Sequence, residues 1–92
     1  MNQLKRISEI RHNLEALILL GKIQIKQNES DEALNTFLEA DYLSAGTRPD
    51  VKYALGIIYH KRSNYLKATN FLGEAVNYDQ ENIKYRFHLV NH

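Results

Sequence analysis

The sequence predicts an all-helical fold built from tandem helix pairs, and three observations support this prediction. Apolar residues recur three and four positions apart along most of the chain, which is the spacing of one buried helix face. The 92 residues include one proline and four glycines, so few positions interrupt a helix. No stretch alternates polar and apolar residues with a period of two, which argues against strands. The predicted helices span residues 3–27, 31–44, 49–62, 65–77 and 80–91.

Residues with the chemistry of helix caps stand where these helices are expected to begin. Ser30 precedes two carboxylates, which favour the positive end of a helix. Thr47 lies three residues before Asp50 with a proline between them, which predicts a capping box. Further caps are expected at Ser63 or Asn64 and at Asp79.

Internal repetition indicates how the helices are arranged. When Leu20-Gly21 is aligned with Leu55-Gly56, residues 14–47 match residues 49–82 with an offset of 35 residues. This is close to the ~34-residue period of a helix-turn-helix repeat, and such repeats stack by burying their apolar faces on one another. We therefore predict one domain, an α-solenoid of antiparallel helix pairs. It comprises an N-terminal helical extension (1–13), two repeats (14–47 and 49–82) and the first helix of a partial third repeat (83–92). A break of the first helix at residues 12–13 is an alternative to one continuous helix.

The repeated residues resemble the tetratricopeptide repeat family. The second repeat follows the family pattern with Leu55-Gly56, Tyr59, Ala68, Leu72 and Ala75, where Leu72 takes an aromatic position. The first repeat has Leu20-Gly21, Gln24, Ala33, Phe37 and Ala40 at the same places, with Gln24 instead of an aromatic residue. Small residues at these positions predict close helix crossings, at which Gly21 meets Ala33 and Gly56 meets Ala68.

Several classes of function find no support in the sequence. It contains no motif of a catalytic or nucleotide-binding site and no cysteine, so we predict no enzyme, no catalytic residue and no cofactor. His88 and His92 share a helical face, but two ligands do not complete a site, and no metal is predicted. The net charge of +1 gives no basis for nucleic-acid binding. The longest apolar run covers residues 16–21, far short of the roughly 20 residues that span a membrane. We expect no membrane insertion and, by default, a cytoplasmic location.

The resemblance implies a protein-binding groove lined by the first helix of each repeat. The family's groove positions correspond here to Ile18, Lys22, Lys26, Tyr53, Ile57, His60, Lys61, Lys84, Phe87 and His88. Apolar and basic residues in one stripe suit a peptide or helix with apolar anchors and acidic flanks. For Ile18 and Ile57, burial is an equally weighted alternative. The clamp with which some members bind chaperone tails is matched only at Lys84, so that partner is not predicted.

The leading functional prediction is an interaction scaffold or chaperone-like adaptor that binds a segment of another protein. The alternative is a structural module that forms homodimers or larger assemblies. This alternative arises because the final helix lacks its partner helix, which leaves Phe87, Leu89 and Val90 without the cover of a full repeat. At the other end, the extension carries Leu4, Ile7 and Ile10 at helical spacing and is expected to cover the stack.

Overall fold

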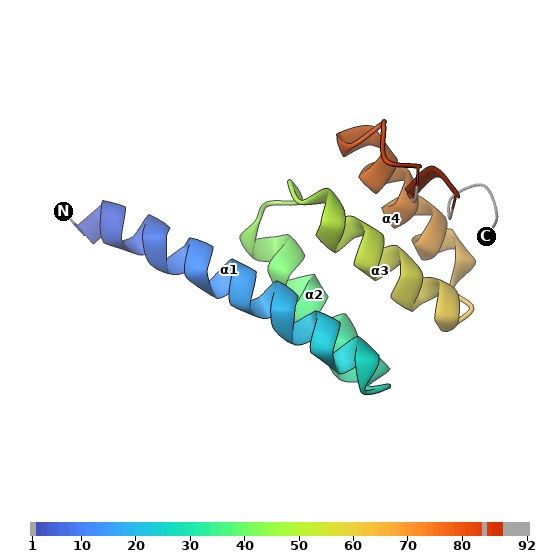
Figure 1. Cartoon of the computed structure of the whole chain (residues 1–92), viewed down its shortest axis with the longest axis horizontal. Helices are drawn as coiled ribbons and strands as arrows, with labels where there is room; N and C mark the ends of the chain where they lie inside the picture. Colours follow the sequence, from blue (N-terminus) through green and yellow to red (C-terminus); the bar gives the residue numbers. More distant parts are fainter. Residues whose placement is uncertain (1, 84, 88–92) are drawn as a thin grey trace.

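The computed structural model describes residues 2–83 and 85–87, and within these ranges it contains helices and loops but no strand. The helices are α1 (Asn2–Lys26), α2 (Ser30–Leu43), α3 (Pro49–Lys61) and α4 (Tyr65–Tyr78). A short helical stretch follows at residues 83 and 85–87. Helix α1 packs on α2, α2 on α3, and α3 on α4 (Figure 1). The predicted all-α class is confirmed.

The helix boundaries repeat with the offset found in the sequence. Helices α2 and α4 begin 35 residues apart and end 35 residues apart, and α1 and α3 also end 35 residues apart. The turns between the helices of each pair repeat as well, because Asn28 and Ser63 both have positive φ, of 62° and 63°. In each turn this residue's amide donates to the carbonyl three residues earlier, at 3.1 Å for Asn28 and 3.0 Å for Ser63. The two pairs therefore have the same backbone plan.

Two glycines lie where the helices of each pair approach most closely. A β-carbon on Gly21 would come within 2.6 Å of the Phe37 ring, and one on Gly56 within 2.7 Å of Leu72. Phe37 and Leu72 are themselves 35 residues apart and almost fully buried. The predicted crossings are therefore present, but the side chain that needs the space is Phe37 in the first pair, not Ala33 as expected. In the second pair, Ala68 contributes a carbonyl oxygen 3.4 Å from the same point, behind Leu72.

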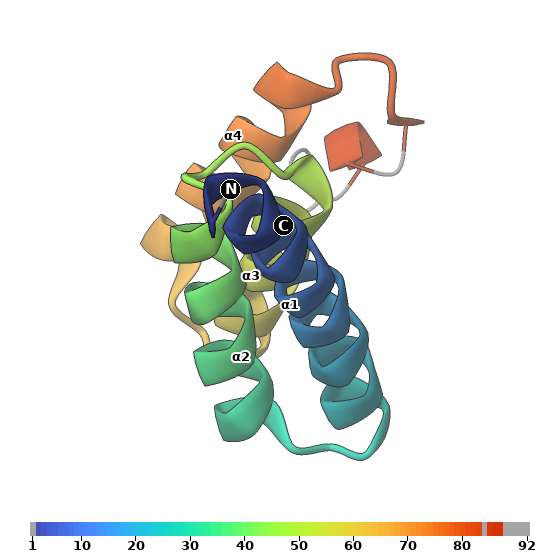
Figure 2. The same ribbon diagram turned by 90° about the vertical axis from the view of Figure 1, so that its left-hand side faces the viewer.

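Helix α1 is continuous, so the possible break at residues 12–13 does not occur. Its 25 residues make it about 37 Å long, whereas the 14 residues of α2 reach only about 21 Å. Figure 1 shows the first turns of α1 projecting beyond the other helices, and Figure 2 looks along this projection. The N-terminal residues thus lengthen α1. Their backbone projects past the other helices (Figure 1), whereas the extension was expected to cover one end of the stack.

One of the predicted caps forms as expected. The Asn64 side chain accepts a hydrogen bond from the Lys67 amide at 3.4 Å, at the start of α4. Ser30 is instead the first residue of α2, and Glu29 takes the cap position without a side-chain bond.

The predicted capping box at the start of α3 does not form. The Thr47 hydroxyl donates to the Ser44 carbonyl at 2.6 Å, and Arg48 occupies the cap position. Asp50 is held by the Arg48 guanidinium, at 2.8 Å. The last helical stretch also differs from the prediction, because Asn82, not Asp79, accepts from the amide three residues later.

Candidate protein-binding surface

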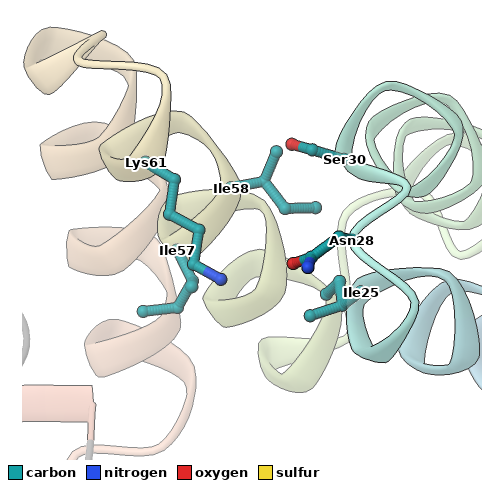
Figure 3. Close-up of a pocket in the computed structure, with 6 residues that line it drawn as sticks. All are labelled: Ile25, Asn28, Ser30, Ile57, Ile58 and Lys61. Carbon is teal, nitrogen blue, oxygen red and sulfur yellow. The ribbon is translucent and has the colours of Figure 1, made fainter.

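Two neighbouring depressions lie along α1 and α3 and share Ile25 and Ile57. The larger, of about 450 Å³, is lined by Lys22, Ile25, Phe37, Asp50, Tyr53, Ala54, Ile57, Asn82 and Tyr85. The smaller, of about 60 Å³, is lined by Ile25, Asn28, Ser30, Ile57, Ile58 and Lys61 (Figure 3). We refer to the two together as the α1–α3 groove. Ile25 and Ile57, which line both depressions, give the groove an apolar floor.

Two lysines flank this apolar floor. Lys22 precedes Ile25 by three residues and Lys61 follows Ile57 by four, so each lysine shares a helix face with a floor isoleucine. Figure 3 shows Lys61 extending from α3 toward Asn28 of the α1–α2 turn. Both lysines are exposed, and neither forms an ion pair with any residue that the structure describes. Their charges are therefore open to a ligand.

The acidic residue that lines the groove, Asp50, shares a single cationic partner with Glu15. Arg48 donates to Glu15 at 2.7 Å and to Asp50 at 2.8 Å, and so joins α1 to the start of α3. The hydrogen bond to Glu15, followed by the one to Asp50, raises the pKa of Arg48. The guanidinium stays charged, but two carboxylates share it, so it offsets only one of their two negative charges. The two positive charges of Lys22 and Lys61 exceed the one that remains, so the groove as a whole favours anionic groups.

A pair of tyrosines forms one wall of the groove. The Tyr53 and Tyr85 rings lie 4.7 Å apart between centroids, and Tyr85 is only 8% exposed. Burial, and then the neighbouring Tyr85, raises the pKa of Tyr53. Burial, and then the charges of Asp50 and Asp79, raises the pKa of Tyr85. Both hydroxyls therefore remain protonated at neutral pH, and the wall is an uncharged aromatic surface.

Four of the predicted groove residues line the depressions, namely Lys22, Tyr53, Ile57 and Lys61. Ile18 does not, because it is 4% exposed and belongs to the core cluster with Leu14 and Phe37. This corrects the assignment of Ile18 to the groove in favour of burial. The reason is its position on α1, four residues after the buried Leu14 and three before Gly21, on the side that faces α2.

The remaining predicted residues are not brought into the depressions. Lys26 is exposed but lines neither, and Phe87 is 61% exposed away from them. His60 is half-buried and meets the Tyr65 ring edge-on, with 5.4 Å between centroids. Lys84 and His88 lie outside the residues that the structure describes.

Sequence reasoning did not assign Phe37, Asn82 and Tyr85 to the larger depression, or Asn28, Ser30 and Ile58 to the smaller one. Phe37 was assigned to the core alone, although its ring borders the larger depression as well. Asn82 and Tyr85 reach the groove because the chain after α4 returns to α3, where the Tyr85 ring packs at a tilt against Tyr53. No local pattern signals that return.

The described part of the chain holds no group of three or more His, Asp or Glu side chains that could bind a metal ion. None of its helices is both long enough and apolar enough to cross a membrane. A comparison with models of protein families and with curated proteins finds no match. A functional proposal therefore depends on the geometry and charge of the α1–α3 groove.

Proposed function

We propose that the chain is a tetratricopeptide-like interaction module, a solenoid of antiparallel helix pairs that binds a segment of another protein in the α1–α3 groove. The observation that carries the proposal is the apolar floor of Ile25 and Ile57 between two exposed lysines without acidic partners. Half-buried apolar surface bordered by uncompensated charge is characteristic of peptide-binding surfaces.

The same residues indicate the chemistry of the ligand. The floor and the tyrosine wall accept an aliphatic or aromatic anchor, which gains free energy by leaving water. Lys22 and Lys61 attract acidic residues beside that anchor and increase the rate of association. The preferred ligand is a peptide or helix with an apolar anchor and acidic flanks.

The proposal is tested by titrating the isotopically labelled protein with a synthetic peptide that has a central Leu-Phe pair between Asp and Glu residues. We expect NMR shift changes to concentrate at Ile25, Tyr53 and Ile57. Replacing both lysines (Lys22→Ala, Lys61→Ala) should lower the association rate at low salt several-fold, because flanking charges act mainly on encounter. Helicity should not change.

A matched control is available on α1 itself. Lys26→Ala removes the same charge from an exposed lysine that lines neither depression, and it should affect association much less than the double change. If the double variant bound the peptide as fast as the unaltered protein, or if shifts appeared away from the groove, the proposal would be wrong.

A second candidate function is homo-oligomerisation through the end of the chain. Ile83 is 81% exposed and Phe87 61% exposed, so the segment after α4 presents two large apolar side chains to water. A second copy could cover them. Sedimentation at micromolar concentration tests this, and a dimer that Phe87→Ser converts to a monomer would support it.

A further inference from the structure

The first helix pair has an uncovered apolar surface on its outer side. A depression of about 340 Å³ between α1 and α2 is lined by Asn13, Ala16, Leu17, Leu20, Glu39 and Leu43. We call it the outer face, and Ile23, which is 43% exposed, extends it along α1. Leu20 and Lys22 are two residues apart and so lie about 200° apart around the helix. The outer face is therefore separate from the α1–α3 groove.

The second helix pair shows what such a surface accepts. The positions 35 residues after Leu20 and Ile23 are Leu55 and Ile58, which are 0% and 1% exposed, whereas Leu20 is 44% exposed. Helix α2 covers them. Its Asp41 reaches Lys52 of α3 at 3.1 Å, and its first residue, Ser30, lies beside Ile58. In the second pair, the surface that corresponds to the outer face is thus covered by a helix of the same molecule.

We infer that the outer face docks an amphipathic helix of a partner protein, in the position on α1 that α2 occupies on α3. The charges specify this helix further. On α3, Lys52 lies between Asp41 of the covering helix and Glu74 of its own pair, at 3.1 and 2.8 Å. On α1, the corresponding residue is Leu17, while Glu39 takes the place of Glu74.

Glu39 is exposed and forms no ion pair within the described residues. The docking helix therefore carries a lysine or arginine where α2 carries Asp41. Such a side chain lays its methylene groups on Leu17 and brings its charge to Glu39. The arrangement reverses the ion pair of the second repeat, with the cation now on the covering helix.

A second copy of this chain does not fit this requirement. Its counterpart of α2 is α4, and the residue that corresponds to Asp41 is Val76. Valine offers no charge to Glu39. A partner of different sequence, with a basic residue in its apolar stripe, is the occupant that the charges favour.

The probe is a peptide of residues 29–46 of this chain, with blocked ends and the change Asp41→Lys. The unaltered peptide is its control, because both pay a similar cost for folding into a helix. We expect the Asp41→Lys peptide to bind about ten-fold more tightly, since a like-charge contact with Glu39 is replaced by an ion pair. NMR shift changes should appear at Leu17, Leu20, Ile23 and Leu43.

A charge reversal on the protein provides the sharper test. Glu39→Lys should invert the preference, so that the unaltered peptide binds more tightly than the Asp41→Lys peptide. Leu20→Glu should abolish binding of both peptides, whereas Leu66→Glu, at a residue 76% exposed on α4, should leave it intact. Circular dichroism checks that each variant is folded.

Three outcomes would overturn the inference. One is the absence of saturable binding of the Asp41→Lys peptide to the folded protein. Another is a peptide preference that Glu39→Lys does not change. The third is a dimer of the unaltered protein that Leu20→Glu dissociates, because the outer face would then belong to a second copy. Binding of the acidic peptide to the α1–α3 groove is measured separately, so failure of one proposal is distinguishable from failure of the other.

Discussion

The two helix pairs have the same backbone plan but different neighbours. Leu20 and Leu55 occupy the same position in the repeat, yet Leu20 is 44% exposed and Leu55 is fully buried. The difference arises because α2 covers the outer side of α3, and no described element covers that side of α1. The repeated residues thus determine how two helices cross, while the burial of a given position depends on what stands next in the stack.

The interiors of the two pairs differ as well. In the first pair, the Thr36 hydroxyl donates to the Gln24 side-chain oxygen at 2.7 Å. Thirty-five residues later, Tyr59 and Phe71 stack with their rings nearly parallel and 5.6 Å apart. One position in the fold therefore holds a polar contact in one copy and an aromatic contact in the other. The backbone arrangement that the two pairs share is therefore compatible with either a polar or an aromatic contact at this position.

The largest expected effect comes from truncating the two equivalent leucines. Leu55→Ala should lower the free energy of unfolding by about 2–5 kcal/mol, because it leaves a cavity in a fully covered site. Leu20→Ala should cost less than about 1 kcal/mol, because water already reaches almost half of that side chain. Urea titration of both variants measures the difference. Equal losses would mean that the outer face of α1 is covered in solution.

These leucines also show how far the sequence predicts the fold. Periodicity and the doubled motif predicted the four long helices to within one residue at every end, because apolar spacing and small residues act locally. The exposure of Leu20 was not predictable from the Leu-Gly pair, since the same pair occurs at Leu55-Gly56. The capping box failed because Arg48 binds Asp50, and this ion pair competes with the local bond.

The candidate site was predictable in part for the same reason. Lys22 and Ile57 were placed on the groove by their positions in the repeat. For Ile18, groove and burial were equally weighted, because periodicity locates a helix face but not which neighbour buries it, and the structure shows burial. The contact of Tyr85 with Tyr53 depends on how the chain turns after α4, and apolar periodicity does not specify the path of that turn.

The next largest effect is expected at Lys52, where the pairs differ in charge. This side chain joins α2 to α4 through Asp41 and Glu74, and the residue is only 8% exposed. Lys52→Met should cost about 1–3 kcal/mol, since two carboxylates lose a shared partner but remain partly reached by water. Leu17→Lys, the same position in the first pair, should cost about 1 kcal/mol, because Leu17 is only partly buried against the core. If Leu17→Lys instead made the protein much more stable, the new lysine would be held more closely by the outer face than the structure indicates.

The Lys52 variant also carries a pH signature. Burial alone lowers the pKa of Lys52, but hydrogen bonds to Glu74 and Asp41 outweigh it and raise the pKa above 10.5. A raised pKa stabilises the fold below the value of the unfolded chain, and this stabilisation is lost as the pH rises through the folded value. Between pH 9 and 12, roughly the range in which lysine titrates, Lys52→Met should therefore lose less stability than the unaltered protein. Thermal melts at constant salt measure this difference.

Smaller effects are expected at the glycines. Gly56→Ala should destabilise the fold by about 1–2 kcal/mol, because the new methyl group would overlap Leu72, and this cost exceeds the gain in helix propensity. Gly21→Ala should destabilise the fold by a similar amount, because the new methyl group would overlap the Phe37 ring. Gly73 is the matched control, because a β-carbon there meets no atom within 4 Å, and Gly73→Ala should stabilise α4 by about 0.5–1 kcal/mol. Destabilisation by only one of the first two variants would break the equivalence of the pairs.

The smallest expected effect concerns the polar contact that distinguishes the interior of the first pair. Thr36→Val removes the donor to Gln24 without changing the shape of the side chain, and should cost about 0.5–1.5 kcal/mol. Gln24→Leu alone should cost less than Thr36→Val, because the Thr36 hydroxyl can still donate to the Glu32 carbonyl at 2.9 Å. The double variant should be closer to the unaltered protein than the two single losses predict, because neither polar group then lacks its partner. A double-mutant cycle by urea denaturation measures this coupling. If the losses were additive, the contact would contribute nothing specific, and the first pair would tolerate an apolar interior like that of the second.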